Sequence, residues 1–116
     1  MLNGLELAHL LVDTVADKKA SDILILDLQN QSMLTDYFLI CTGENSRQIG
    51  AIADSIIDDA RAKGQVRAFG REGTTHTGWV LVDFGDLIVH IFSPEKRAFY
   101  DLEELWRNSH VVLRMP

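Results

Sequence analysis

The sequence of 116 residues is poor in cysteine, in basic residues and in long apolar runs. Its single cysteine, Cys41, cannot form an internal disulfide, which is typical of a protein from a reducing compartment. Eleven Lys and Arg residues against seventeen Asp and Glu give a formal net charge of −6. Because so few cations are available to neutralise phosphates, we expect little direct nucleic-acid binding. The negative charge instead favours a basic protein partner.

No apolar run approaches the ~20 residues that span a bilayer, so no membrane attachment is expected. The first 46 residues contain only two basic residues, Lys18 and Lys19, and show neither a signal-peptide nor a transit-peptide pattern. An apolar share of 47% is enough for one hydrophobic core in a chain of this length. We therefore expect a single cytoplasmic domain over residues 1–107.

Hydropathy periodicity predicts an α/β domain with the element order α-β-β-α-β-β-β-α. The predicted elements are a helix at 3–19, strands at 23–28 and 37–42, a helix at 46–63, strands at 65–68, 79–84 and 87–92, and a helical segment at 94–106. This order predicts a mixed sheet of about five strands flanked by helices. Residues 108–116 show no period and are expected to form a C-terminal tail of unknown role. The pattern leaves open whether helices cover both faces of the sheet.

The two strands at 79–84 and 87–92 are predicted to form a hairpin with Gly85 and Asp86 in its turn. Since side chains alternate along a strand, the hairpin residues divide into two sets. The first set is wholly apolar and predicts a buried face: Val80, Val82, Phe84, Leu87, Val89 and Ile91. The second set mixes aromatic, aliphatic and ionisable side chains: Trp79, Leu81, Asp83, Ile88, His90 and Phe92.

The second face of the hairpin allows three interpretations. Burying Asp83 without a partner would cost several kcal/mol, so this face should reach solvent or a polar partner. Exposed together, its apolar residues would form a patch that is typical of an interaction site. Alternatively, the last helix covers the face and Asp83 pairs with His90. In a mixed outcome, the helix covers only one end.

The sequence gives little support for catalysis. Cys41 lies within an apolar run, where a cysteine usually behaves as a small buried hydrophobe. Asp83, Asp86 and His90 are close in sequence, but no Asp-x-Asp pair lies on a predicted strand, as metal-assisted phosphoryl transfer would favour. We therefore expect no catalytic residue, no metal site and no cofactor.

Three segments in the same order resemble the signatures of the ribosomal silencing factors, also called Iojap-like proteins. The first is TDYFLICTG at 35–43, followed by NSRQ at 45–48. The second is GWVLVDFGDLIVHIF at 78–92, and the third is YDLEELW at 100–106. The resemblance extends from about residue 5 to residue 107 and does not include the tail.

This resemblance implies a translation repressor without enzymatic activity, whose fold is similar to that of nucleotidyltransferases. Such proteins bind the large ribosomal subunit through its ribosomal protein number fourteen, a basic protein. They sterically block joining of the small subunit when nutrients are scarce, and they also aid late large-subunit assembly. The resemblance further implies a homodimer when the protein is free. The alternatives are a small nucleotidyltransferase-like enzyme and a factor for subunit assembly alone.

The resemblance also implies which residues bind the partner. They lie on the second signature, on the closing segment and in the loop before the hairpin: Glu72, Trp79, Leu81, Asp83, Asp86, His90, Tyr100 and Leu105. In this interpretation Trp79 and Leu81 supply apolar contact, whereas Asp83 pairs with a partner Lys or Arg. The positions of the first signature are interpreted as mainly architectural.

Overall fold

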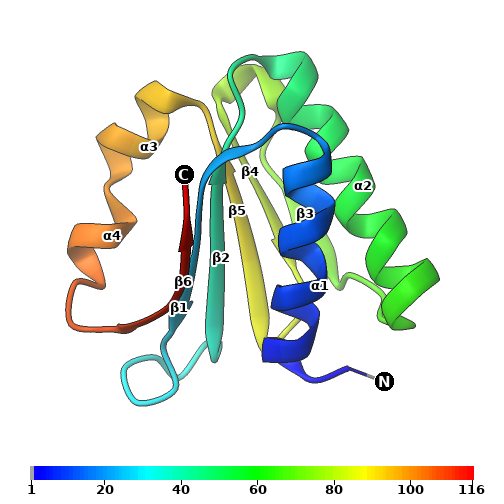
Figure 1. Cartoon of the computed structure of the whole chain (residues 1–116). Helices are drawn as coiled ribbons and strands as arrows, with labels where there is room; N and C mark the ends of the chain where they lie inside the picture. Colours follow the sequence, from blue (N-terminus) through cyan, green and yellow to red (C-terminus); the bar gives the residue numbers. More distant parts are fainter. Residues whose placement is uncertain (1) are drawn as a thin grey trace.

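The computed structural model describes residues 2–116, which form one mixed β-sheet between two layers of helices (Figure 1). None of the helices in this part of the chain is long and apolar enough to cross a membrane. The helices are α1 (Gly4–Asp17), α2 (Ser46–Gly64), the 3₁₀ turn η1 (Thr75–Thr77), α3 (Pro94–Tyr100) and α4 (Leu102–Leu105). The strands are β1 (Ser21–Asp27), β2 (Tyr37–Thr42), β3 (Gly70–Glu72), β4 (Trp79–Asp83), β5 (Leu87–Phe92) and β6 (His110–Met115).

The sheet has six strands in the order β3-β4-β5-β2-β1-β6. Strands β2 and β5 are parallel, and all other neighbouring pairs are antiparallel. The chain between these two parallel strands runs through α2, which packs on one face of the sheet, and then through β3 and β4. The predicted α/β class with a mixed sheet is therefore confirmed, but the sheet has one strand more than the element order implied.

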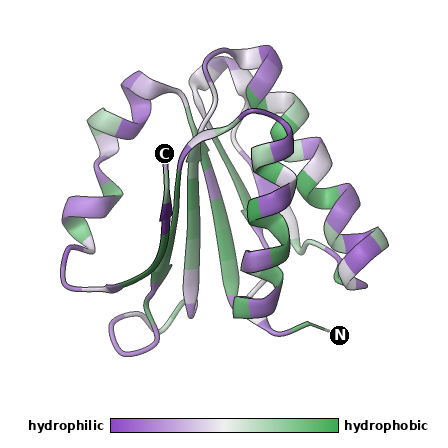
Figure 2. Cartoon of the chain, viewed as in Figure 1, coloured by the Kyte–Doolittle hydropathy of each residue, from purple (hydrophilic) through white to green (hydrophobic). Residues whose placement is uncertain are grey.

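Helices α1 and α2 pack on the first face of the sheet. Asn3 caps α1 by accepting a hydrogen bond from the Glu6 amide, and the Glu6 side chain accepts one in return from the Asn3 amide. Asn45 caps α2 in the same way through the Gln48 amide. Both helices direct an apolar stripe at the sheet, visible as green bands in Figure 2. The main core lies between these helices and the sheet.

The second face of the sheet carries only the short helices α3 and α4 (Figure 1). Leu102 and Trp106 pack there on a smaller apolar cluster formed by strands β1, β2 and β5. The members of that cluster are Leu24, Leu26, Leu28, Phe38, Ile40 and Phe92. The continuous helix predicted over 94–106 is wrong, because Asp101 adopts a left-handed conformation with φ of +49° and separates α3 from α4. The two helices therefore cover the β5-β2-β1 part of the face rather than all of it.

The predicted strand at 65–68 is also wrong, since β3 lies at 70–72. Gln65 adopts a left-handed conformation that ends α2, and the Val66 amide turns back to the Ala60 carbonyl at 3.0 Å. The chain joins the sheet only at Phe69, whose amide donates to the Asp83 carbonyl at 2.8 Å. All three residues of this strand are exposed, and so short and polar a segment shows no strand period.

Residues 108–116, for which no element was predicted, contain the edge strand β6. It pairs antiparallel with β1 and has a register shift between Ile25 and Leu26. Val112 and Leu113 pack partly on the main core, whereas the other β6 residues are exposed. Because only two adjacent residues of β6 are partly buried, apolar and polar residues do not alternate along it. The sequence therefore shows no strand period there.

Deleting residues 108–116 should lower the free energy of unfolding by about 2–4 kcal/mol, because the partly buried Val112 and Leu113 and the β1–β6 hydrogen bonds are lost. Urea unfolding followed by circular dichroism measures this change. The matched control is Arg114→Ala, which alters an exposed β6 side chain. An unchanged urea midpoint in the deletion variant would show that β6 does not stabilise the domain.

Candidate functional site

The β4–β5 hairpin has the register that the sequence predicts. Trp79 lies opposite Phe92, Leu81 opposite His90 and Asp83 opposite Ile88. The Phe84 amide donates to the Leu87 carbonyl at 2.8 Å, which closes the two-residue turn. Gly85 occupies this turn with φ of +90°, a conformation that favours glycine. The hairpin therefore presents one face to the main core and the other to the side of α3 and α4.

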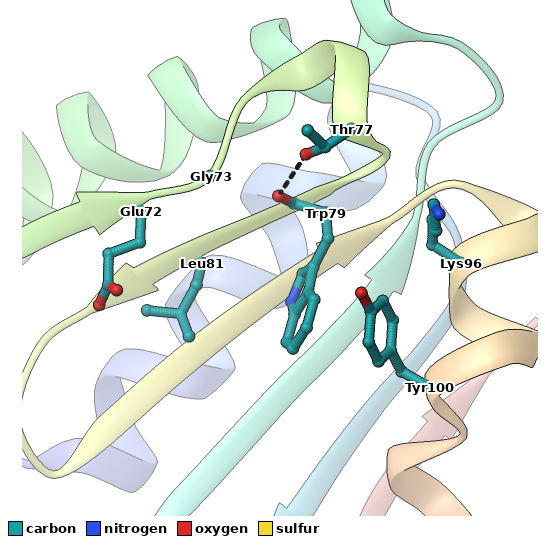
Figure 3. Close-up of a pocket in the computed structure, with 7 residues that line it drawn as sticks. All are labelled: Glu72, Gly73, Thr77, Trp79, Leu81, Lys96 and Tyr100. Atoms are coloured by element: carbon teal, nitrogen blue, oxygen red, sulfur yellow. Dashed lines mark hydrogen bonds between the residues drawn. The ribbon is translucent and has the colours of Figure 1, made fainter.

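A groove of about 470 Å³ lies on this second face, between the β3–β4 edge of the sheet and α3 (Figure 3). We call it the β4 groove, and it is lined by Glu72, Gly73, Thr77, Trp79, Leu81, Lys96 and Tyr100. Figure 3 shows the Trp79 indole at its centre, between the Leu81 side chain and the Tyr100 ring. The groove exists because α3 and α4 stop short of β3 and β4. This arrangement matches the mixed interpretation, in which helices cover only one end of the face.

The Trp79 side chain is half-buried and held on several sides. Its ring centroid lies 4.4 Å from that of Tyr100 and 5.1 Å from that of Phe92. Its Nε1 donates a hydrogen bond of 3.1 Å to Nδ1 of His90. These contacts fix the orientation of the indole in the unbound protein. The indole can therefore offer apolar area with little loss of side-chain entropy on binding.

His90 lies beneath Trp79, and only 4% of its surface is exposed. Burial lowers the pKa of His90 from 6.5 to about 4, so the ring is neutral at pH 7. Since Nδ1 accepts the hydrogen bond from Trp79, the ring proton lies on Nε2. Nε2 has no hydrogen-bond partner among residues 2–116. Because His90 is buried, it is not available for direct contact with a partner, and it orients Trp79 instead.

Asp83 lies beyond Leu81 on the same face and is half-buried. Its Oδ1 accepts a hydrogen bond of 2.7 Å from the Gly85 amide, which stabilises the hairpin turn. Within the described chain Asp83 and His90 make no hydrogen bond to each other; His90 pairs with Trp79 and Asp83 with the Gly85 amide. A carboxylate at this partly exposed position adds negative charge beside the apolar floor of the groove.

The eight residues that the resemblance assigned to the site do not all come together. Glu72, Trp79, Leu81 and Tyr100 line the β4 groove. Asp83 and His90 border it, respectively farther along β4 and beneath the indole. Two others lie elsewhere.

Asp86 is exposed at the hairpin tip, and its side chain lies beside Gly4 at the start of α1. There the carboxylate complements the positive end of the helix dipole. Leu105 is 71% exposed on α4 and does not line the groove.

Three residues of the groove were not found by sequence reasoning: Gly73, Thr77 and Lys96. Gly73 has φ of +84°, and a Cβ atom there would lie 2.2 Å from the Trp79 carbonyl oxygen. Only glycine therefore fits beside the start of β4. Lys96 lies on α3, with its Nζ 5.6 Å from the centroid of the Phe99 ring. These residues come from three separate segments, and the only signal was the Gly- and Thr-rich composition of the loop at 70–78.

The remaining candidate for a chemical role, the thiol of Cys41, belongs to the core. Cys41 is fully buried, and burial raises the pKa of its thiol to about 12, so it is not a nucleophile at neutral pH. This burial confirms its interpretation as a small core residue. No group of three or more His, Cys, Asp or Glu residues that could hold a metal ion occurs within the described range.

Comparison with known proteins identifies the family. A family model described as "Ribosomal silencing factor during starvation" matches residues 2–115. The chain belongs to this family. The ribosomal silencing factor RsfS of Bacillus subtilis is 48% identical over 91 residues, which cover 78% of this chain and 75% of that protein.

Two further comparisons found a solved bacterial structure and a mouse protein. A crystal structure of protein CV0518 from Chromobacterium violaceum superposes with a TM-score of 0.86 and 34% identity, covering 91% of this chain and 88% of that one. The mouse protein named "Mitochondrial assembly of ribosomal large subunit protein 1" is 30% identical over 102 residues, 84% of this chain and 43% of its own length. The relatives of this chain thus include proteins named for silencing and for assembly.

The buried neutral state of His90 predicts a pH dependence of stability. Below pH 6.5 the unfolded chain gains a proton at His90, whereas the folded chain gains it only near pH 4. Acidification from pH 7 to pH 4.5 should therefore cost about 2–3 kcal/mol of unfolding free energy through His90.

Urea unfolding of the wild type and of His90→Leu at both pH values measures this contribution. Between pH 7 and pH 4.5 the wild type should lose more unfolding free energy than His90→Leu, by the stated amount. The exposed His110 supplies the control variant His110→Gln, which should retain the wild-type dependence. Equal losses in wild type and His90→Leu would contradict the buried neutral state.

Proposed function

We propose that this silencing-factor family member binds the large ribosomal subunit at its ribosomal protein number fourteen through the β4 groove and the adjoining Asp83. While bound there, it sterically blocks joining of the small subunit and so represses translation. Its fold, in this proposal, is of the nucleotidyltransferase type and serves binding rather than catalysis. The observation that supports the proposal is the open end of an otherwise covered sheet face, where a fixed indole lies near the carboxylates of Glu72 and Asp83 and the ammonium group of Lys96.

The chemistry of the groove suits a basic protein surface. Trp79 and Leu81 offer apolar area that becomes desolvated on contact, and tryptophan is enriched among the residues that dominate binding energies. Glu72 and Asp83 place two carboxylates around this area, and each can accept a charge-assisted hydrogen bond from Lys or Arg. The net charge of −6 would also speed the encounter with a basic partner.

The names of the relatives support the same target. The bacterial relative is named a silencing factor, and the mouse relative is named for assembly of the large ribosomal subunit. A role in late large-subunit assembly uses the same docking face in our proposal, so one surface serves both activities. A homodimer of the free protein is a further part of the proposal, and analytical ultracentrifugation tests it.

Trp79→Ala should weaken binding to purified large subunits by about thirtyfold or more, because truncation of such a residue commonly costs about 2 kcal/mol. Asp83→Asn should weaken binding through loss of charge while retaining Oδ1 as the acceptor for the Gly85 amide. Binding is measured by co-sedimentation with titrated protein. Asp58→Asn, an exposed residue of α2 on the opposite side of the sheet, is the charge-matched control. If Trp79→Ala and Asp83→Asn bind as well as this control, the docking surface lies elsewhere.

Steric blocking predicts that the protein depletes whole ribosomes. When purified large and small subunits are mixed after saturation of the large subunit with the protein, the whole-ribosome peak on a sucrose gradient should fall and free subunits should accumulate. Trp79→Ala at the same concentration should leave the peak unchanged. Undiminished subunit joining at demonstrated saturation would refute the blocking mechanism while leaving the docking surface intact.

A further inference from the structure

Helix α3 forms one wall of the β4 groove, yet none of its own seven residues is buried. A helix this short is unstable in isolation, so its position must come from contacts outside itself. Its start is fixed by Ser93, whose hydroxyl accepts from the Lys96 amide and whose own amide donates to the Gly78 carbonyl at 2.8 Å. These contacts lie at the start of α3, whereas Tyr100 lies at its end. The position of Tyr100 therefore depends on a further contact.

Arg97 provides that attachment. Its side chain is only 12% exposed, and its Nε donates to Oε1 of Glu103 at 2.9 Å. Its Nη1 donates to Oγ1 of Thr42 at 2.9 Å and also to the carbonyl oxygen of Asp22. One guanidinium therefore links α3 to α4, to the end of β2 and to the start of β1.

The geometry of this attachment determines where Tyr100 lies. Tyr100 follows Arg97 by three residues, so the two side chains emerge from neighbouring positions on one helix face. Its hydrogen bonds to both strands restrain the distance and rotation of α3 relative to the sheet. In this arrangement the Tyr100 ring lies 4.4 Å from the Trp79 ring and lines the groove.

We propose that Arg97 is a positioning residue for the β4 groove: its hydrogen bonds to Thr42, Asp22 and Glu103 hold α3 so that Tyr100 remains packed on Trp79. This role in partner binding rests on the proposed function. The effect on Tyr100 and Trp79 belongs to the free protein and can be tested without a partner.

The free-protein test uses a Trp106→Phe background, in which Trp79 is the only tryptophan. Acrylamide quenching of its fluorescence reports how open the indole is. Arg97→Met should raise the quenching constant to the value found for Tyr100→Ala. The control is Arg61→Met, the same substitution at an exposed position of α2, and it should leave quenching unchanged.

Circular dichroism of each variant shows whether the fold persists. If Arg97→Met unfolds, Arg97→Lys keeps the charge without the planar fork, and it should give quenching between wild type and Tyr100→Ala. Wild-type quenching in a folded Arg97→Met protein, or in Arg97→Lys where Met unfolds, would overturn the proposal.

The binding test is a double-mutant cycle with purified large subunits. Arg97→Met should weaken binding roughly tenfold. Because Arg97 acts through Tyr100, the same substitution should have less than about a twofold effect in a Tyr100→Ala background. An equal loss in both backgrounds would show that Arg97 acts independently of Tyr100 and would overturn the positioning role. If the wild type does not bind at all, the proposed function fails, whereas the quenching experiment still decides the effect on Tyr100.

Discussion

Two short helices cannot cover the whole second face of a six-stranded sheet, and the candidate site follows from this constraint. Helices α1 and α2 close the first face, but α3 and α4 have only seven and four residues. They protect the apolar cluster over β1, β2 and β5 and leave the β3–β4 end open. Trp79 and Leu81 lie at this boundary, and both are half-buried. The same side chains would be ordinary core residues under a longer helix.

The open end is nevertheless rigidly organised. The Trp79 indole is fixed by a hydrogen bond to His90 and by packing against Phe92 and Tyr100. Because His90 is neutral, its Nδ1 remains an acceptor, and protonation of the ring would remove that bond. A site ordered before binding loses little conformational entropy when its partner arrives, so more of the contact energy contributes to affinity. The buried histidine and the groove above it thus form one unit.

The elements predicted from the sequence are those that depend on a local turn or on regular alternation of apolar and polar residues. The hairpin register followed from the Gly85–Asp86 turn and the alternation of its strands, and the register is observed as predicted. Strand β6 was not predicted, because an edge strand that is mostly exposed lacks a hydropathy period. The alternation also placed His90 on the same face as Trp79 and Phe92, yet its burial also depends on Phe38 of β2, a strand outside the hairpin. Which residues of a face remain accessible is decided by distant helices, and this could not be derived from local patterns.

Side-chain footprinting of the bound protein tests the central claim most directly. Hydroxyl radicals oxidise exposed aromatic residues, and Tyr100 is 43% exposed while Trp79 is partly so. Saturating large subunits should protect both residues and leave the exposed His9 of α1, on the opposite layer, as reactive as in the free protein. Equal oxidation of Trp79 and Tyr100 in the bound and free states, or protection of His9 in their place, would contradict docking through the β4 groove.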